Sequence, residues 1–361
     1  MYDVRSQFPV LKNYIYANTA SSGLPSVDLM EWRNQHDQAF LNGGSMMREK
    51  AHALITKTRE TVARFFVASY ENVALLQNFS IGINMLLEGL DKDEKVLFLE
   101  NDYPSVSWPF ERRNFLVSFA KMDEHLEENI LQKIEQEKIT VLAVSIVQWL
   151  NGIKIDLDFL NRLKNQFPDL LIIADGTQFC GTADFNFEES GIDVLGASCY
   201  KWLLSGYGNG FMLFKDSVKE RARLKTIGFN AANADKSKKD NVRFAKRFEP
   251  GHLDTLNFGS LKFSLEFFEK LGKKDVQNKL EELSRYAKEQ LVDLKLIQNE
   301  VVLRNGHSTI FNIKGSHSLY RVLNDKKVIC SQRGDGIRLS FHLYNTKNDI
   351  DEIIKILKTA S

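Results

Sequence analysis

Short runs of apolar residues recur through the first two thirds of the chain, separated by segments whose apolar residues lie three or four positions apart. Helical spacing of this kind appears at 81–88, 124–135 and 157–165. Strands buried on both faces and separated by helices are typical of a mostly parallel sheet that helices cover on both sides. The runs that we interpret as buried strands are 73–76, 95–99, 139–146, 170–174, 193–197 and 210–214.

The pattern changes on either side of this alternating region. Before it, an irregular start leads into one amphipathic helix, for which Ser45 is a candidate N-cap. After it, a charged and loop-like stretch at 222–247 precedes two long amphipathic helices at 253–271 and 275–296. The remaining segment predicts a small α+β domain. Its strands and helices are expected at 309–313, 327–330, 336–341, 318–323 and 347–358.

The fold class that these patterns predict is α/β, with a large domain and a small one. The length of 361 residues also favours a large domain plus a smaller one over a single unit. We expect residues 1–20 to form an N-terminal arm that contributes to the small domain, and residues 21–250 to form the large domain. Residues 251–361 then supply the long helices and the small C-terminal α+β domain.

Charge and cysteine content narrow the function classes. The 48 basic and 47 acidic residues give a formal net charge of +1, so the overall field does not favour nucleic acid or an anionic membrane as a partner. Cys180, Cys199 and Cys330 are widely spaced, which suits neither a disulfide framework nor a zinc site. The sequence shows neither a signal peptide nor an apolar run long enough to span a membrane. We therefore expect a cytoplasmic protein without a metal that acts on a small molecule.

Polar side chains follow two of the predicted buried strands. Asp175 comes directly after the strand at 170–174, Gln178 lies three residues later, and Lys201 follows the next strand. Singly, Asp175 would be interpreted as a turn residue and Lys201 as a lysine whose amine reaches water. Ligands of an open parallel sheet, however, bind beyond the carboxyl ends of its strands. There, a lysine that forms a Schiff base and a carboxylate that keeps a pyridine nitrogen protonated are the requirements of a pyridoxal phosphate site.

Such a site also needs a place for the phosphate group. The stretch LLQNFSIGINMLL leads from the strand at 73–76 through Asn78 and Ser80 into an amphipathic helix. The free N–H groups and the positive end of that helix are suited to an anion. The three elements together therefore predict pyridoxal phosphate as the cofactor.

The residues named so far resemble the class V aminotransferases of fold type I, a family that includes cysteine desulfurases, kynureninase and isopenicillin N epimerase-like proteins. The resemblance covers nearly the whole chain. Asp175-Gly-Thr-Gln178 resembles the D-x-x-Q motif, which implies that Asp175 meets the pyridine nitrogen and Gln178 the ring hydroxyl. Ser198-Cys-Tyr-Lys201 resembles the S-x-H-K motif. This implies that Ser198 and Tyr200, which replaces the usual histidine, hold the phosphate, and that Lys201 carries the cofactor.

Three further segments extend this resemblance. The segment from Phe79 through Ser80 to residue 84 resembles the phosphate turn A-T-E-x-x-N, which implies cofactor contacts from both residues. The segment at 102–108 resembles the one that stacks on the cofactor ring, which implies Tyr103 in that role, with Trp108 as the alternative. The segment RFEPGH resembles R-F-E-x-G-T, whose threonine reaches the phosphate of the neighbouring subunit. His252 replaces that threonine, so the resemblance implies a cofactor contact from His252 in a homodimer whose active site lies at the subunit interface.

The stretch GIRLSFHLYNT resembles the R-x-S-x-x-x-Y-N-T ending of the family. This implies that Arg338 binds the α-carboxylate of the substrate, because a guanidinium group makes two charge-assisted hydrogen bonds to a carboxylate. Arg333 is a nearby candidate for the same role. The resemblance thus implies an enzyme that acts on a small α-amino acid through a Lys201 Schiff base, with Lys201 and Asp175 as its catalytic residues.

The cysteines bear on which reaction is expected. A cysteine desulfurase needs a mobile nucleophilic cysteine on a loop before Arg338, whereas Cys330 lies in a predicted strand with a very short connection after it. We therefore expect an aminotransferase or an isopenicillin N epimerase-like enzyme first, and a cysteine desulfurase or C–S lyase second.

Two other hypotheses belong to different classes of protein. A nicotinamide dehydrogenase would use Gly206-Tyr-Gly208-Asn-Gly210, but these glycines precede a strand and not a helix. The second hypothesis is a binding protein that has the same fold but no catalytic activity. The presence of both Lys201 and Asp175 argues against it.

Overall fold

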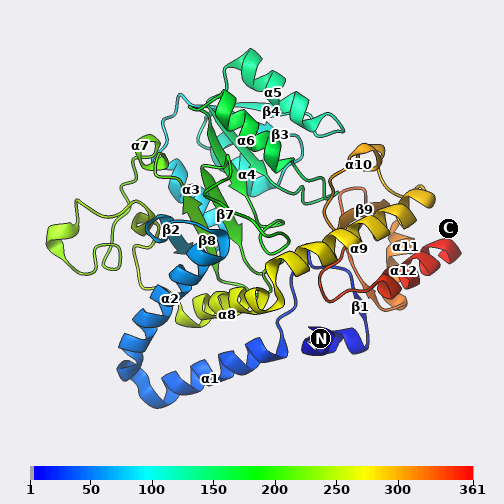
Figure 1. Cartoon of the computed structure of the whole chain (residues 1–361), viewed down its shortest axis with the longest axis horizontal. Helices are drawn as coiled ribbons and strands as arrows, with labels where there is room; N and C mark the ends of the chain where they lie inside the picture. Colours follow the sequence, from blue (N-terminus) through cyan, green and yellow to red (C-terminus); the bar gives the residue numbers. More distant parts are fainter. Residues whose placement is uncertain (1–3, 361) are drawn as a thin grey trace.

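A mixed β-sheet organises the larger part of the chain (Figure 1). Within the residues that the computed structural model describes, 4–360, seven strands form this sheet in the order β2-β8-β7-β6-β5-β3-β4. Neighbouring strands run parallel except at β8, which is antiparallel to both β7 and β2. The prediction of a mostly parallel sheet is confirmed. The strands are β2 (Val73–Leu76), β3 (Lys95–Leu99), β4 (Leu116–Ala120), β5 (Val141–Ser145), β6 (Leu171–Asp175), β7 (Val194–Ser198) and β8 (Gly210–Phe214).

Helices cover both faces of this sheet, which explains its continuous apolar strands. Along β2, Leu75 belongs to one buried cluster while Ala74 and Leu76 belong to another, because successive side chains of a strand point to opposite faces. Among residues 4–360, no helix combines the length and the apolar character needed to cross a bilayer. The helices up to residue 271 are α1 (Val27–Gly43), α2 (Arg48–Phe66), α3 (Phe79–Leu87), α4 (Pro104–Glu111), α5 (Leu126–Glu137), α6 (Leu157–Gln166), α7 (Val218–Arg221) and α8 (Thr255–Leu271).

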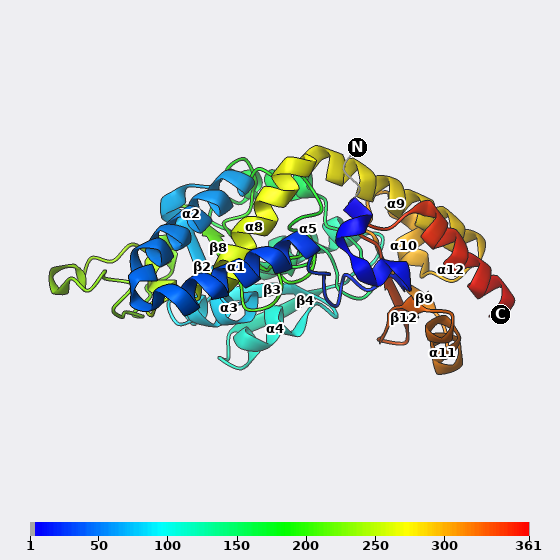
Figure 2. The same cartoon turned by 90° about the horizontal axis from the view of Figure 1, so that it is seen from below.

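The long helix α9 (Lys273–Asp293) leads from the large sheet to the C-terminal part of the chain (Figures 1 and 2). Within the described residues, that part contains an antiparallel three-stranded sheet of order β11-β12-β9. The elements of this C-terminal part are β9 (Ile310–Lys314), β10 (Val328–Ile329), β11 (Ser331–Arg333), β12 (Gly336–Ser340), α10 (Asn299–Leu303), α11 (His317–Asp325) and α12 (Lys347–Ala360).

The beginning of the chain contacts this C-terminal part. Strand β1 (Ile15–Tyr16) pairs in parallel with β10, and Arg5 forms an ion pair with Asp349 at 2.8 Å. Residues 1–3 of the predicted arm lie outside the described residues. The domain boundaries at 20 and 250 stay a prediction.

The charged stretch at 222–247 projects from the body of the molecule in both views (Figures 1 and 2). It contains short 3₁₀ turns, as do several connections elsewhere in the chain. Among residues 4–360, these turns lie at Val4–Gln7, Pro9–Lys12, Gly44–Met47, Tyr70–Asn72, Lys236–Lys238 and Ala245–Phe248.

Helix α1, strand β4 and helix α4 are among the elements that the sequence analysis missed, and the prediction for Ser45 was wrong. Helix α1 buries only Leu29 and so has no apolar stripe to detect; it is capped by Ser26, whose hydroxyl accepts from the Leu29 N–H at 3.1 Å. Strand β4 lies at the sheet edge, where Leu116 is exposed, and α4 contains an internal proline. Ser45 is not an N-cap: it lies in a 3₁₀ turn, and α2 begins at Arg48 without a side-chain cap.

Candidate active site

The carboxyl ends of β6 and β7 bring an acid and a lysine to one edge of the large sheet. Asp175 is the last residue of β6 and pairs in register with Ser145 of β5 and Gly196 of β7. Lys201 follows β7 by three residues. The exposed fraction is 5% for Asp175 and 6% for Lys201, so both ionisable groups are buried at this edge.

Lys201 has an environment that favours the neutral amine. The pKa of Lys201 is lowered to about 8: burial lowers it most, the Asp175 carboxylate raises it, and the positive charges of Arg338 and Arg333 lower it. The amine lies 5.5 Å from the centre of the Tyr103 ring and 5.6 Å from that of Tyr200. A neutral lysine amine is the form that attacks an aldehyde, so this lysine suits a carbonyl cofactor.

The Asp175 carboxylate is held by the turn that follows it. The Thr177 N–H donates to Oδ1 of Asp175 at 2.8 Å, and the Thr177 hydroxyl accepts from the Ser198 N–H at 3.0 Å. Burial raises the pKa of Asp175, while the hydrogen bonds from Thr177 and the charge of Lys201 lower it. A buried carboxylate needs a positive partner, which a protonated pyridine nitrogen supplies.

The Gln178 side chain is held on both sides. Its amide nitrogen Nε2 donates to the Ala20 carbonyl at 3.0 Å, and Oε1 accepts from the Trp202 indole N–H at 2.6 Å. The residue therefore links the N-terminal segment to the residue that follows Lys201. Its predicted contact with a cofactor hydroxyl stays a prediction.

Hydroxyl groups gather around the first turn of α3. Asn78 caps this helix, and the Phe79 N–H donates to the Ser198 hydroxyl at 3.0 Å. The Ser80 hydroxyl donates to that of Ser105 at 2.7 Å. The Phe79 ring is buried in the core, so this residue offers its backbone to the site. Backbone N–H groups and hydroxyls at a helix N-terminus fit a phosphate group.

Aromatic side chains surround the lysine. Tyr200 stacks on Tyr207 with ring centroids 4.4 Å apart, and Tyr103 makes an edge contact with Trp149 at 5.8 Å. Burial raises the pKa of Tyr200 to about 12, so its hydroxyl stays protonated and can donate to an anion. Trp108 is 64% exposed, which leaves Tyr103 as the better placed of the two candidates for stacking.

Arg338 is a buried cation whose hydrogen-bond partners are neutral. Its Nη1 donates to the Trp149 carbonyl and its Nη2 to the Ser21 hydroxyl, both at 2.7 Å. Among residues 4–360, its buried Nε has no hydrogen-bond partner. Burial, together with the charge of Arg333, lowers the pKa of Arg338 to about 10. A buried guanidinium with an unpaired N–H fits the carboxylate of a ligand.

Asp102 is a buried acid at the same edge that the sequence analysis missed as a site residue. Its Oδ1 accepts from the Tyr103 N–H at 2.6 Å and its Oδ2 from the Ser145 N–H at 2.8 Å. Burial, with a smaller contribution from the charge of Asp175, raises the pKa of Asp102 to about 6. The signal was available, because Asp102 follows β3 much as Asp175 ends β6. Through these bonds Asp102 positions the backbone of Tyr103.

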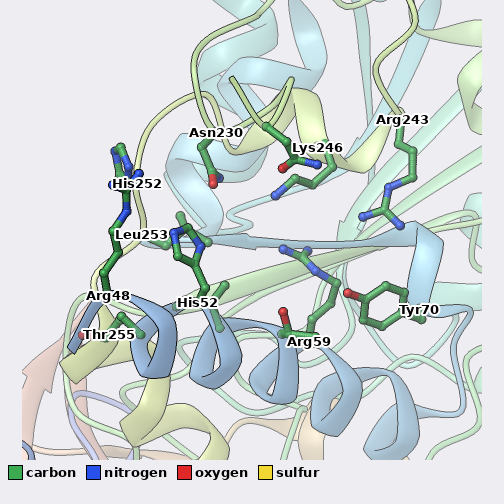
Figure 3. Close-up of a pocket in the computed structure, with 14 residues that line it drawn as sticks. Arg48, His52, Arg59, Tyr70, Asn230, Arg243, Lys246, His252, Leu253 and Thr255 are labelled. Atoms are coloured by element: carbon green, nitrogen blue, oxygen red, sulfur yellow. The ribbon is translucent and has the colours of Figure 1, made fainter. Parts of the chain in front are cut away.

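His252 lies in a separate basic cavity, beside α2 (Figure 3). Its ring stacks on Phe229 with centroids 5.3 Å apart. In Figure 3, Arg59 extends from α2 toward Lys246 in the opposite wall of this cavity. The structure places His252 here and not among the side chains around Lys201. Its predicted contact therefore requires a second subunit, and both the contact and the homodimer stay predictions.

A buried lysine and a buried aspartate at the carboxyl edge of this mixed sheet define a class of protein, the fold type I pyridoxal phosphate enzymes. The sequence model of the family "Aminotransferase class-V" matches residues 15–353. The chain belongs to this family, whose cofactor is pyridoxal phosphate. The lysine, the aspartate and the first turn of α3 fit that cofactor.

Individual relatives carry several names. A probable cysteine desulfurase of Ureaplasma parvum serovar 3 is 24% identical, covering 99% of this chain and 97% of the relative. The uncharacterized aminotransferase YcbU of Bacillus subtilis is 23% identical, covering 97% and 96%. Among solved structures, a C-DES mutant with glycine covalently linked to its PLP cofactor has a TM-score of 0.87 at 16% identity and covers 98% of both chains. A complex of the cystine C–S lyase C-DES with its reaction product cysteine persulfide has a TM-score of 0.85 at 16% identity, covering 97% and 99%. At this identity the structural matches show a shared fold.

Proposed function

We propose that this protein is a pyridoxal phosphate enzyme that cleaves the C–S bond of a cysteine-derived α-amino acid by β-elimination, without a protein thiol as nucleophile. This proposal reverses the order of the hypotheses drawn from the sequence, which put an aminotransferase or epimerase first. The names of the relatives support the change, because cysteine desulfurases and a C–S lyase are prominent among them.

The observation that carries the proposal is the burial of the cysteines. Cys330 is 5% exposed and lies between β10 and β11, and β11 turns directly into β12. Burial raises the pKa of Cys330 to about 12 and raises the pKa values of Cys180 and Cys199 as well. A thiolate is the nucleophilic form of cysteine, and the buried surroundings of these three thiols disfavour the thiolate. Elimination needs a base at the α-carbon and no protein thiol.

The residues around Lys201 have roles that suit this reaction. When bound, pyridoxal phosphate stabilises the negative charge that develops at the α-carbon of the substrate. Arg338 binds and orients the α-carboxylate. The Lys201 amine, whose lowered pKa of about 8 makes its neutral form accessible near neutral pH, accepts the α-proton at Nζ. Asp175 holds a proton on the pyridine nitrogen, and the rings of Tyr103 and Tyr200 limit the access of water.

The test is to incubate the holoenzyme with S-substituted L-cysteines and L-cystine. The net reaction of an S-substituted cysteine with one water gives a thiol, pyruvate and ammonia, so equal amounts of thiol and pyruvate are expected. Cys330→Ala should keep the rate within about twofold, since no thiol takes part, while Lys201→Ala should abolish product formation. Circular dichroism of each variant checks that it is folded.

Two results would overturn the proposal. If the Cys330→Ala variant is folded but releases no sulfur product, a protein thiol is required. If the enzyme moves its amino group to a 2-oxo acid and releases no thiol, it is an aminotransferase.

A further inference from the structure

The β11–β12 hairpin carries two arginines on one face. Arg338 pairs in register with Ser331, and Arg333 lies two residues beyond Ser331 on the same strand. Residues two apart on a strand share a face, and so do cross-strand partners. Ser331 and Arg338 both contact Ser21 of the N-terminal segment through hydrogen bonds of 3.0 Å and 2.7 Å. This face of the hairpin therefore packs against the N-terminal segment around Ser21, which lies beside the active site.

Arg333 acts electrostatically on the active site without being neutralised. Its positive charge lowers the pKa of both Lys201 and Arg338, in agreement with its position on the same face of the hairpin as Arg338. Its Nη1 donates to the Gln332 carbonyl at 3.0 Å, and within residues 4–360 it forms no ion pair. The nearest acid in sequence, Asp335, lines a cavity whose walls include Gln148 and Leu150 and not Arg333.

Positive side chains outnumber negative ones around Lys201. Within the described chain, Asp175 is the one acid that raises the pKa of Lys201, whereas two arginines, Arg338 and Arg333, lower it. One α-carboxylate bound at the unpaired Nε of Arg338 neutralises that arginine and leaves Arg333 without a partner. A second guanidinium on the same face is suited to a second carboxylate.

We propose that Arg333 forms a second anion subsite, which binds a distal carboxylate of the substrate while Arg338 binds the α-carboxylate. The substrates are then amino acids with a carboxylate at each end, such as S-carboxyalkyl cysteines or disulfides of cysteine. The sulfur in these substrates rests on the proposed function, whereas the need for a distal carboxylate rests on the placement of Arg333.

The test compares two ligands that differ in one group. S-carboxymethyl-L-cysteine carries a distal carboxylate, and S-carbamoylmethyl-L-cysteine carries a neutral amide of the same shape. Dissociation constants are measured with the holoenzyme by calorimetry and by the change in the visible absorption of the bound cofactor, while pyruvate release is followed separately. The variants are Arg333→Gln and Arg338→Gln. Arg321→Gln on α11 serves as a control for the loss of one exposed positive charge from the same part of the chain.

Arg333→Gln should weaken the carboxylate ligand about tenfold and the amide ligand less than about twofold, as expected for the loss of one charge-assisted contact. Arg338→Gln should weaken both ligands equally, and Arg321→Gln neither. An equal loss for both ligands in Arg333→Gln would assign Arg333 to the α-carboxylate, and no loss for either would leave it without a ligand role; each overturns the inference. The expected binding difference without pyruvate release would uphold the inference and contradict the proposed function.

Discussion

The buried ion pair between Arg59 and Glu249 offers a sharp test of how this fold is held together. Two nitrogens of Arg59 donate to the two carboxylate oxygens of Glu249 at 2.6 and 2.7 Å. Lys246 donates to the same carboxylate at 2.7 Å, and the Leu75 N–H donates at 2.8 Å. The side chains of Arg59 and Glu249 are 3% and 0% exposed. The carboxylate thus ties α2, β2 and the segment leading to His252 to one point.

The substitution Glu249→Gln removes the negative charge and leaves the volume almost unchanged. Arg59 then remains buried with an uncompensated charge, and removal of one partner of a buried pair costs about 3–5 kcal/mol. For 361 residues, an unfolding entropy of about 2.1 cal/mol/K per residue gives about 0.76 kcal/mol/K. The expected decrease in Tm is therefore about 4–7 °C.

A second arginine–glutamate pair, between Arg64 of α2 and Glu269 of α8, provides a matched control. Arg64 donates to both oxygens of Glu269 at 2.9 and 2.8 Å, so the geometry is similar, but the two side chains are 55% and 29% exposed. Glu269→Gln should cost less than about 1 kcal/mol, since water screens an exposed pair. The comparison isolates the effect of burial from that of hydrogen-bond geometry.

The assay is thermal unfolding by circular dichroism or calorimetry at neutral pH, with all variants at the same cofactor concentration. The double substitution Arg59→Met with Glu249→Leu should regain much of the lost stability, because it removes both buried charges. Equal losses of Tm in the Glu249→Gln and Glu269→Gln variants would refute the reasoning. So would a double variant less stable than Glu249→Gln.

Two pH dependences follow from the site and from the core. The rate at which the apo-protein captures pyridoxal phosphate, followed by stopped-flow absorption, should rise through about pH 8 as Lys201 loses its proton. The Asp175→Asn variant should have its midpoint at lower pH, because the Asp175 carboxylate raises the pKa of Lys201. An unshifted midpoint in this variant would contradict the reasoning. His342 is buried, its Nδ1 accepts from the Leu343 N–H at 2.7 Å, and burial lowers its pKa to about 4. Because the unfolded chain binds the proton near pH 6.5, the stability contributed by neutral His342 is present above that pH and falls by about 3 kcal/mol as the pH falls to 4. In urea unfolding of the His342→Gln variant, the free energy of unfolding should depend less steeply on pH over this range. An equally steep dependence would mean that His342 is not the group responsible.

The local sequence predicted the elements that lie deepest in the fold. Strands buried on both faces, such as β6 and β8, have continuous apolar runs because each residue meets a packed layer. The same logic fails at the surface: α1 buries only Leu29, and β4 has a solvent-facing edge, so neither produces a clear period. The acids at strand ends were only partly recognised, since Asp175 was identified and Asp102 was not.

The sequence by itself determined the buried strands of the large sheet, the chemistry-bearing motifs and the family resemblance, because each depends on residues that are neighbours along the chain. Tertiary structure decided what depends on contacts across the chain. Within residues 4–360 it left the Nε of Arg338 without a partner, and it buried Cys330 beside a tight hairpin and put Arg333 on the face shared with Arg338. It also placed His252 in a cavity apart from Lys201. Burial and charge balance are sums over groups far apart in sequence, so the pKa of Lys201 and the state of the cysteines became visible only once the chain was folded.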